Sequence, residues 1–193
     1  MVLKAGLYGL GALVLVAVLV TAIGYALPQN HVATKDAFLT ATPQEVFERI
    51  TDVARYPDWR QDVSTVEVVS REPLRWMEHS GGDTITYEMV EATSPTRLVV
   101  RIADPDLPFG GTWTYDLRPE GEGTRLTITE HGEVYNPVFR FVSRFVFGHS
   151  ASIEKMLEAL NAAAPPPIST SRADRPSDVR SFHRTASRGR RRW

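Results

Sequence analysis

Residues 124–163 read TRLTITEHGEVYNPVFRFVSRFVFGHSASIEKMLEALNAA, and the spacing of apolar side chains changes within this stretch. Up to residue 134, apolar and polar side chains alternate, as they do in a β-strand with one buried face. Asn136 and Pro137 then form a typical helix start, and apolar residues follow at intervals of about 3.6 positions to residue 163. A strand followed by a long helix with one apolar face predicts an α+β fold in which that helix packs on a sheet.

The chain before this stretch predicts the rest of the sheet. Short alternating segments are separated by turn residues, which is typical of antiparallel strands. Thr42, Pro43 and Glu45 form a capping box with proline at the first helical position, so a helix begins there, and a second short helical piece ends near Trp59. The predicted strands are 32–41, 63–70, 74–79, 84–92, 97–103, 112–117 and 124–134.

Ala5 to Leu27 are 23 consecutive residues without a charged side chain. As a helix this segment is about 34 Å long, enough to cross a hydrocarbon core of ~30 Å. A cleaved signal peptide is the competing interpretation, with Gly24-Tyr25-Ala26 as its cleavage site, but its apolar region is typically only ~7–15 residues long. We therefore expect a single-pass membrane anchor and spacer over residues 1–31. The flanking positive charges are nearly balanced, and the default orientation puts the domain on the extracytoplasmic side.

Charge is distributed unevenly along the rest of the chain. Residues 28–164 carry 13 Lys and Arg against 21 Asp and Glu, whereas residues 165–193 carry 8 Arg against 2 Asp. An acidic domain excludes a nucleic-acid-binding function, because affinity for nucleic acid comes mainly from neutralising phosphates. The arginine-rich tail has no apolar periodicity, so we expect residues 165–193 to be disordered, with anionic lipid headgroups as a candidate contact. The chain has no cysteine, which excludes disulfides and thiolate metal sites.

Five short motifs carry a resemblance to a known family. They are Thr-Pro-Gln-Glu-Val-Phe (42–47), Tyr-Pro-Asp-Trp (56–59), Leu-Pro-Phe-Gly-Gly-Thr-Trp (107–113), Gly-Thr-Arg-Leu-Thr-Ile-Thr-Glu (123–130) and Asn-Pro-Val-Phe-Arg-Phe (136–141). With the order of elements, they resemble the START-like (SRPBCC, polyketide cyclase-like) superfamily over the predicted domain, residues 32–164. The resemblance implies a helix-grip fold: a curved seven-stranded antiparallel sheet, two short helices and a long C-terminal helix around a cavity for an apolar ligand. The superfamily includes lipid carriers, hormone receptors, aromatase/cyclases and ring hydroxylases, and it has no single catalytic set to carry over.

Aromatic residues gather on the faces that are expected to point inward. Each of them is explained by core packing alone, since aromatic side chains bury large areas wherever they lie. As a group they also suit the wall of a pocket for an apolar ligand. The candidate ligand-binding residues are Trp59, Trp76, Tyr87, Trp113, Tyr115, Phe141 and Phe145, together with His149 on the apolar stripe of the C-terminal helix and Glu130.

Glu130 is the most informative polar residue. It shares one strand face with Leu126 and Ile128, so its carboxylate is expected to point into the interior. A buried carboxylate needs a partner or a proton. One interpretation is a structural partner, with Arg101, Arg140 or Tyr115 as the candidates, and the other is a role in anchoring a ligand or in acid–base chemistry.

The sequence predicts neither a metal site nor a cofactor. His131 and Glu133 are a candidate ligand pair, but the same alternation places them on the outward face of the strand. The favoured function is membrane-anchored binding of a hydrophobic small molecule, either a lipid or a lipid-like or polyketide-like metabolite. A cyclase/dehydrase-type enzyme that uses Glu130 and a histidine as acid and base is the first alternative, so catalysis stays open. A non-catalytic interaction module with a filled core is the second.

Overall fold

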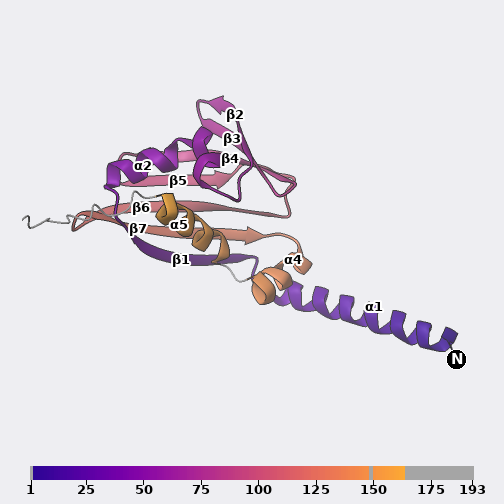
Figure 1. Ribbon diagram of the computed structural model, residues 1–193. Coiled ribbons are helices and arrows are strands. Elements are labelled where there is room, and N and C mark those ends of the chain that lie inside the picture. The colour runs from indigo at the N-terminus through magenta and orange to yellow at the C-terminus, as the bar shows by residue number, and fades with distance from the viewer. Residues whose placement is uncertain (1, 148–149, 164–193) are drawn as a thin grey trace, which may run out of the picture.

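The computed structural model describes residues 2–147 and 150–163. Seven antiparallel strands form one sheet in the order β1-β7-β6-β5-β4-β3-β2, with helix α5 lying across one face (Figure 1). The predicted α+β architecture with seven strands is therefore confirmed. The strands are β1 (Asn30–Leu39), β2 (Thr65–Arg71), β3 (Leu74–Ser80), β4 (Asp83–Thr93), β5 (Arg97–Ile102), β6 (Phe109–Glu120) and β7 (Gly123–Val134).

The two short helices begin and end where local chemistry requires. Helix α2 (Pro43–Thr51) has the predicted capping box: the Glu45 carboxylate accepts from the Thr42 N–H at 2.8 Å, and the Thr42 hydroxyl oxygen accepts from the Glu45 N–H at 3.3 Å. A 3₁₀ turn, η1 (Val53–Arg55), leads into α3 (Tyr56–Trp59). The residues that α2 buries are Val46, Phe47 and Ile50.

The C-terminal helical region is divided, so the prediction of one continuous helix from Asn136 to Ala163 is wrong. It consists of α4 (Pro137–Val142), a π-helical turn η2 (Ser143–Phe147) and α5 (Ala151–Ala163). A π-helical turn shifts the direction in which later side chains point, so the apolar stripe does not stay on one face. Helix α5 packs on the sheet, where it contacts β1 and β7, whereas α4 packs mainly against the N-terminal helix.

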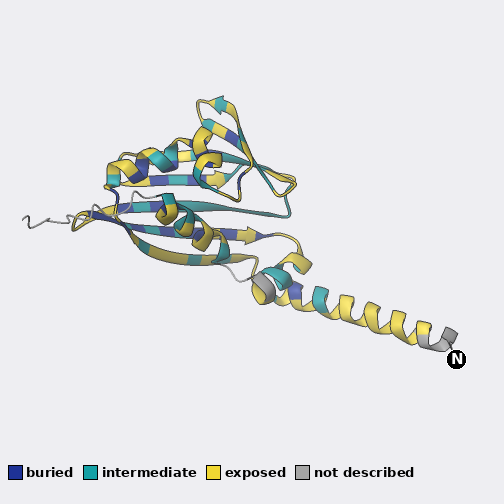
Figure 2. Ribbon diagram, viewed as in Figure 1, coloured by how far each residue is buried: buried dark blue, intermediate teal, exposed yellow. Residues whose placement is uncertain are grey.

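The core lies between the sheet and α5. Figure 2 shows buried residues on the strands, α2 and α5, and an exposed N-terminal helix. Ile153 and Leu160 of α5 are each 1% exposed and belong to one cluster with Leu126 and Ile128 of β7. Each buried aliphatic side chain of this kind contributes about 1.5–3 kcal/mol, so these contacts hold α5 against the sheet.

Helix α1 (Val2–Ala26) projects from the domain (Figure 1). Its segment Tyr8–Ala26 has a mean hydropathy of 2.2 and is almost entirely uncovered by the rest of the chain. Helix α1 is long enough and apolar enough to span a membrane, although an N-terminal signal sequence would satisfy the same criteria. The predicted arginine-rich tail, residues 165–193, lies outside the described residues.

Candidate functional site

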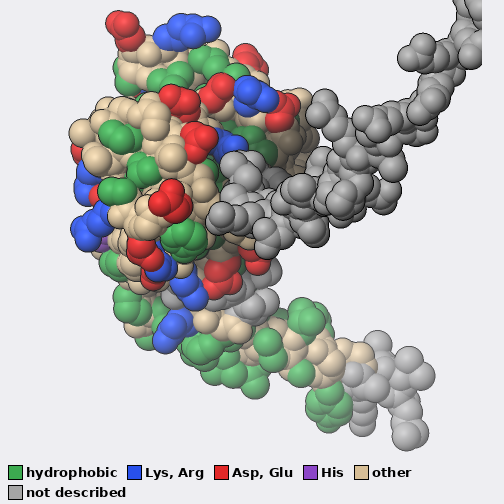
Figure 3. All heavy atoms as spheres, turned by 60° about the vertical axis from the view of Figure 1, so that its left-hand side comes forward, with side chains coloured by type: hydrophobic (Ala, Val, Ile, Leu, Met, Phe, Trp, Pro, Cys, Tyr) green, Lys and Arg blue, Asp and Glu red, His purple; other side chains and the backbone are tan. Residues whose placement is uncertain are grey.

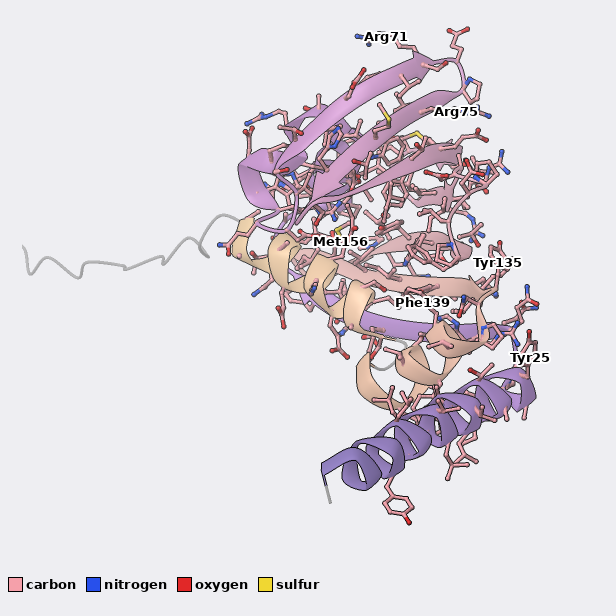
Figure 4. All side chains as sticks on the ribbon, turned by 90° about the vertical axis from the view of Figure 1, so that its right-hand side faces the viewer. Tyr25, Arg71, Arg75, Tyr135, Phe139 and Met156 are labelled. Atoms are coloured by element: carbon pink, nitrogen blue, oxygen red, sulfur yellow. The ribbon has the colours of Figure 1, made fainter. Side chains whose placement is uncertain are left out.

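Two adjoining chambers lie between the sheet and the C-terminal helices. The outer chamber, of about 320 Å³, is nearer to α1, and its wall includes His31, Phe109, Glu130 and Phe139. The inner chamber, of about 240 Å³, is lined by residues that include Tyr56, Arg60, Trp76, Glu78, Tyr115 and Met156. In Figure 4, Phe139 marks the outer chamber and Met156 the inner one. Ile85, Tyr87, Trp113 and Ser152 line both chambers, so the two form one elongated space.

The outer chamber contains the Glu130 carboxylate, which is 8% exposed and points inward as predicted. Trp113 Nε1 donates to its Oε2 at 2.9 Å, and the Ser152 hydroxyl donates to the same oxygen at 2.5 Å. The second oxygen, Oε1, lies 3.3 Å from His31 Nε2. Two neutral donors and a histidine therefore hold the carboxylate in place at the cavity wall.

None of the partners predicted for Glu130 is correct. Arg101 instead binds Glu88, with Nη2 2.8 Å from Oε1, because the alternation of β5 places Arg101 on the opposite face of the sheet. The Arg140 guanidinium donates to backbone carbonyls, with Nε 2.7 Å from the Val134 oxygen. Tyr115 lines the inner chamber, and its hydroxyl makes no hydrogen bond to a described residue. The carboxylate thus lacks an arginine partner among the described residues.

The actual partners of Glu130 come from distant parts of the chain. In the antiparallel register of β1 and β7, Ala33 is opposite Glu130, and His31 lies two residues from Ala33 on the same face. Ser152 approaches from the first turn of α5. Sequence reasoning missed His31 because the pairing of β1 with β7 was not predicted, and it missed Ser152 because the division of the C-terminal helix was not predicted.

The inner chamber has a second polar cluster, which the sequence analysis also missed. Arg60 Nη1 lies 2.9 Å from Glu78 Oε2, and Arg60 Nη2 lies 2.8 Å from Asp62 Oδ2. Trp76 Nε1 donates to Glu78 Oε1 at 2.9 Å, and the guanidinium lies over the Tyr56 ring at 5.0 Å. Burial raises the pKa of Glu78, while the attraction of Arg60 opposes that rise.

The alternation of β3 was the available signal for this cluster, since Trp76 and Glu78 are two residues apart on the face that points inward. The side chains of both are buried, and that of Arg60 is 12% exposed. A salt bridge in such a position is weak evidence for stability, because removing two charges from water costs free energy. The Arg60–Glu78 salt bridge at the wall of the cavity therefore calls for a functional explanation rather than one based on stability.

Tyr87 and Tyr115 contribute two hydroxyl groups to this space. Burial raises the pKa of both phenols well above the ordinary value, so both are neutral donors at physiological pH. Neither hydroxyl has a hydrogen-bond partner among the described residues, and both residues line the inner chamber. The cavity therefore combines aromatic walls with hydroxyl groups that a bound molecule could use.

The chain matches a known family over most of its length. Residues 31–165 fit the family profile described as polyketide cyclase / dehydrase and lipid transport. The chain belongs to this family. Membership confirms the resemblance to the START-like superfamily that the sequence motifs predict. No curated protein matches the sequence.

Solved structures show the fold that is typical of the polyketide cyclase/dehydrase and lipid transport family. A START superfamily protein from Mycobacterium smegmatis has a TM-score of 0.56 at 15% identity, with 68% of this chain and 94% of that chain covered. The di-domain ARO/CYC protein StfQ of the steffimycin biosynthetic pathway has a TM-score of 0.58 at 17% identity, with 70% and 51% covered. Norcoclaurine synthase from Thalictrum flavum has a TM-score of 0.55 at 11% identity, with 68% and 84% covered. At these identities the matches establish the helix-grip fold alone.

In this member of the family, the sequence-predicted residues fall into two groups. Four of the aromatics line the cavity: Trp76, Tyr87, Trp113 and Tyr115. Trp59 instead packs edge-on against Tyr56 at 5.4 Å, outside both chambers, and its buried Nε1 has no partner among the described residues.

The remaining predicted residues lie in the divided helical region. Phe145 is 60% exposed, so the expectation that it faces the sheet is wrong. Phe141 is half-buried and packs against Phe145, with ring centroids 4.9 Å apart, and it is not among the residues that line the chambers. His149 lies outside the described residues. His131 and Glu133 are both exposed, and the described part of the chain contains no group of three side chains suited to a metal ion.

Proposed function

We propose that the protein binds a hydrophobic small molecule with a polar end, a lipid or a lipid-like metabolite, while anchored to a membrane by α1. The single observation that carries this proposal is the elongated cavity with aromatic walls and a fixed carboxylate, Glu130, in its outer chamber. Small-molecule sites are typically concave and mostly apolar, with a few polar groups that fix the orientation of the ligand. Family membership is consistent with the binding of such ligands.

The cavity argues against the alternative of an interaction module with a filled core. Native interiors are close-packed, with few voids larger than a water molecule. The two chambers, of about 320 and 240 Å³, are partly open to solvent and are far larger than such voids. Space of this size, lined by unpaired hydroxyl groups, is better suited to a ligand than to packing.

One observation favours a second candidate, a cyclase/dehydrase-type enzyme. Glu130 and His31 are two titratable groups within 3.3 Å of each other at the wall of the same chamber. A carboxylate that accepts a proton and a histidine that relays one are the elements of general acid–base catalysis. In that case Glu130 would accept a proton from the substrate, and His31 would help to return it to a leaving hydroxyl group.

Solvent extraction of the purified full-length protein, followed by mass spectrometry, tests both candidates. The binding proposal predicts that a defined hydrophobic compound is extracted from wild type and lost from Ile85→Trp, which fills the junction of the chambers. Val69→Trp is the matched control, because Val69 is 55% exposed on β2 and away from the cavity. Extraction of the same compound in equal amount from Ile85→Trp would contradict the proposal.

Glu130→Gln separates binding from catalysis in the same assay. A binding protein retains less of the same compound, because the amide changes one hydrogen bond to its polar end. A dehydrase retains the unconverted substrate, which is heavier by one water molecule. A heavier compound in Glu130→Gln alone would therefore favour the enzyme.

A further inference from the structure

Helix α4 is fixed to the end of α1 by close backbone contact. Gly24 is buried there, and a Cβ atom at this position would overlap the carbonyl group of Pro137. Glycine therefore permits the two backbones to meet. Arg140 Nη1 lies 3.4 Å from the Gly24 oxygen and 3.5 Å from the Leu27 oxygen. Carbonyls at the end of a helix lack intrahelical partners, so Arg140 caps α1 and holds α4 beside it.

This contact sets the depth of α4 relative to any membrane that α1 spans. The partly or fully buried residues of α1 and its end are Val20, Thr21, Gly24 and Leu27, which lie on one face. They extend over about 10 Å of helix, because each residue adds ~1.5 Å. In a spanning helix these last turns lie at the boundary between acyl chains and headgroups. Helix α4, packed beside them, lies at the same depth.

The surface of α4 and η2 is suited to that position. Val138, Phe139 and Phe145 are 42%, 50% and 60% exposed. Figure 3 shows hydrophobic side chains along α1 and at its junction with the domain. Figure 4 places Tyr25, Tyr135 and Phe139 at this end of the molecule and Arg71 and Arg75 at the opposite end. Interfacial segments bury apolar side chains among the acyl chains and keep aromatic hydroxyls near the headgroups.

The cavity opens toward the same surface. Phe139 and Ser143 form part of the wall of the outer chamber. A groove of about 330 Å³ adjoins that chamber through His31, Val134 and Ser143, and it runs to Leu27 at the end of α1. The chamber that contains Glu130 therefore adjoins a groove that reaches the surface where α1 leaves the domain.

We propose that α4 and η2 insert into the membrane leaflet beside the end of α1, so that a ligand passes from the bilayer directly into the outer chamber. This inference rests on the proposed function for its ligand and for its anchor. The lipid leaflet covers the exposed apolar face of α4 and η2, since that face is continuous with the apolar surface of α1 (Figure 3). The ligand would avoid transfer through water, and Phe139 would lie at the mouth of the chamber.

Fluorescence quenching tests the insertion directly, because the chain has no cysteine and each introduced cysteine is labelled alone. Full-length Val138→Cys and Val69→Cys are labelled with an environment-sensitive fluorophore and reconstituted into phosphatidylcholine vesicles with spin-labelled acyl chains. We expect at least several-fold stronger quenching at position 138 than at position 69, which lies at the opposite end of the molecule. Equal quenching at the two positions, with α1 still resistant to carbonate extraction, would overturn the inference.

The rate of ligand transfer tests the proposed route from the bilayer into the outer chamber. Val138→Asp places a charge on the inserted face at a residue that does not itself line the outer chamber. Vesicles containing a photoreactive fatty acid are mixed with the reconstituted variant and irradiated at increasing times. We expect labelling of the cavity to slow at least several-fold and to reach the wild-type level at long times. An unchanged rate would overturn the route. If wild type shows no cavity labelling at any time, the proposed function fails, while the quenching result still decides the insertion.

Discussion

Removing the Glu78 carboxylate tests whether the polar side chains of the inner chamber, Arg60, Glu78 and Trp76, stabilise one another. Glu78→Leu leaves the Arg60 guanidinium, 12% exposed, without its buried partner, and it also removes the acceptor for Trp76 Nε1. Breaking a buried pair in this way costs about 3–5 kcal/mol. We expect a value near ~3 kcal/mol, because Asp62 still pairs with Arg60 at 2.8 Å and water can occupy the chamber. For a domain of this size the melting temperature should fall by about 10 °C.

A double variant makes the test specific. Arg60→Met combined with Glu78→Leu removes both charges, and buried ion pairs replaced by apolar side chains often leave stability unchanged or raised. We expect the double variant to be more stable than Glu78→Leu by about 2 kcal/mol, with the remaining loss due to the unpaired Trp76 N–H and to the partly exposed Asp62 carboxylate, which loses its pair with Arg60. Glu91→Leu is the control, because its pair with Arg97 is about half exposed and should contribute less than ~1 kcal/mol.

Thermal unfolding of the full-length protein in detergent, followed by tryptophan fluorescence, gives these differences. The reasoning would be refuted if Glu78→Leu melted within a degree or two of wild type. It would also be refuted if the double variant were less stable than the single one, because the cost would then not come from an unpaired charge.

Three further predictions concern the anchor, the outer face of the sheet and the docking of α4. Val14→Arg together with Val18→Arg should release the protein from carbonate-washed membranes, since each charge costs ~2.5–3.5 kcal/mol at mid-helix; a mature N-terminus at Leu27 would contradict the anchor. Hydrogen bonding to Arg101 is the largest cause that lowers the pKa of Glu88. The lowered pKa means that the ionised Glu88 stabilises the folded state. This stabilisation is present above the unfolded-state pKa of about 4.3 and is lost as pH falls through the lowered folded-state pKa. Glu88→Gln should therefore be less stable than wild type at pH 7 and should lose less stability in acid. Gly24→Leu should speed hydrogen exchange in α4 without changing exchange in the sheet, and unchanged exchange in α4 would contradict the packing.

Much of the fold could be predicted from the sequence, because its signals are local. The Thr42 and Glu45 capping box depends on residues three positions apart, and the inward direction of Glu130 depends on the alternation within one strand. Those features do not depend on which strands are neighbours. For the same reason six of the seven strands were predicted to within two residues at each end, whereas β6 extends three residues beyond the predicted 112–117 at both ends.

The site could be predicted only in part, because its contacts join distant segments. His31 and Glu130 are 99 residues apart, and only the register of β1 against β7 brings them together. Arg60 meets Glu78 through the packing of α3 beside the sheet. The division of the helix was not predicted, although Gly148 follows η2 in the sequence, because the apolar periodicity continues on both sides of it. The apolar residues of α4 and η2 lie beside α1 and on an exposed surface instead of on the sheet.

Photolabelling in membranes tests most directly whether a hydrophobic ligand binds in the two chambers, because it locates the ligand. The full-length protein is reconstituted with a diazirine fatty acid, irradiated and digested, and the labelled peptides are identified by mass spectrometry. Labelling of α1 reports contact with the bilayer and serves as the internal control. The account predicts additional labelling of peptides from β4 around Ile85 and Tyr87 and from α5 around Ser152 and Met156, which is abolished in Ile85→Trp. Labelling confined to α1 and α4, identical in wild type and Ile85→Trp, would contradict it.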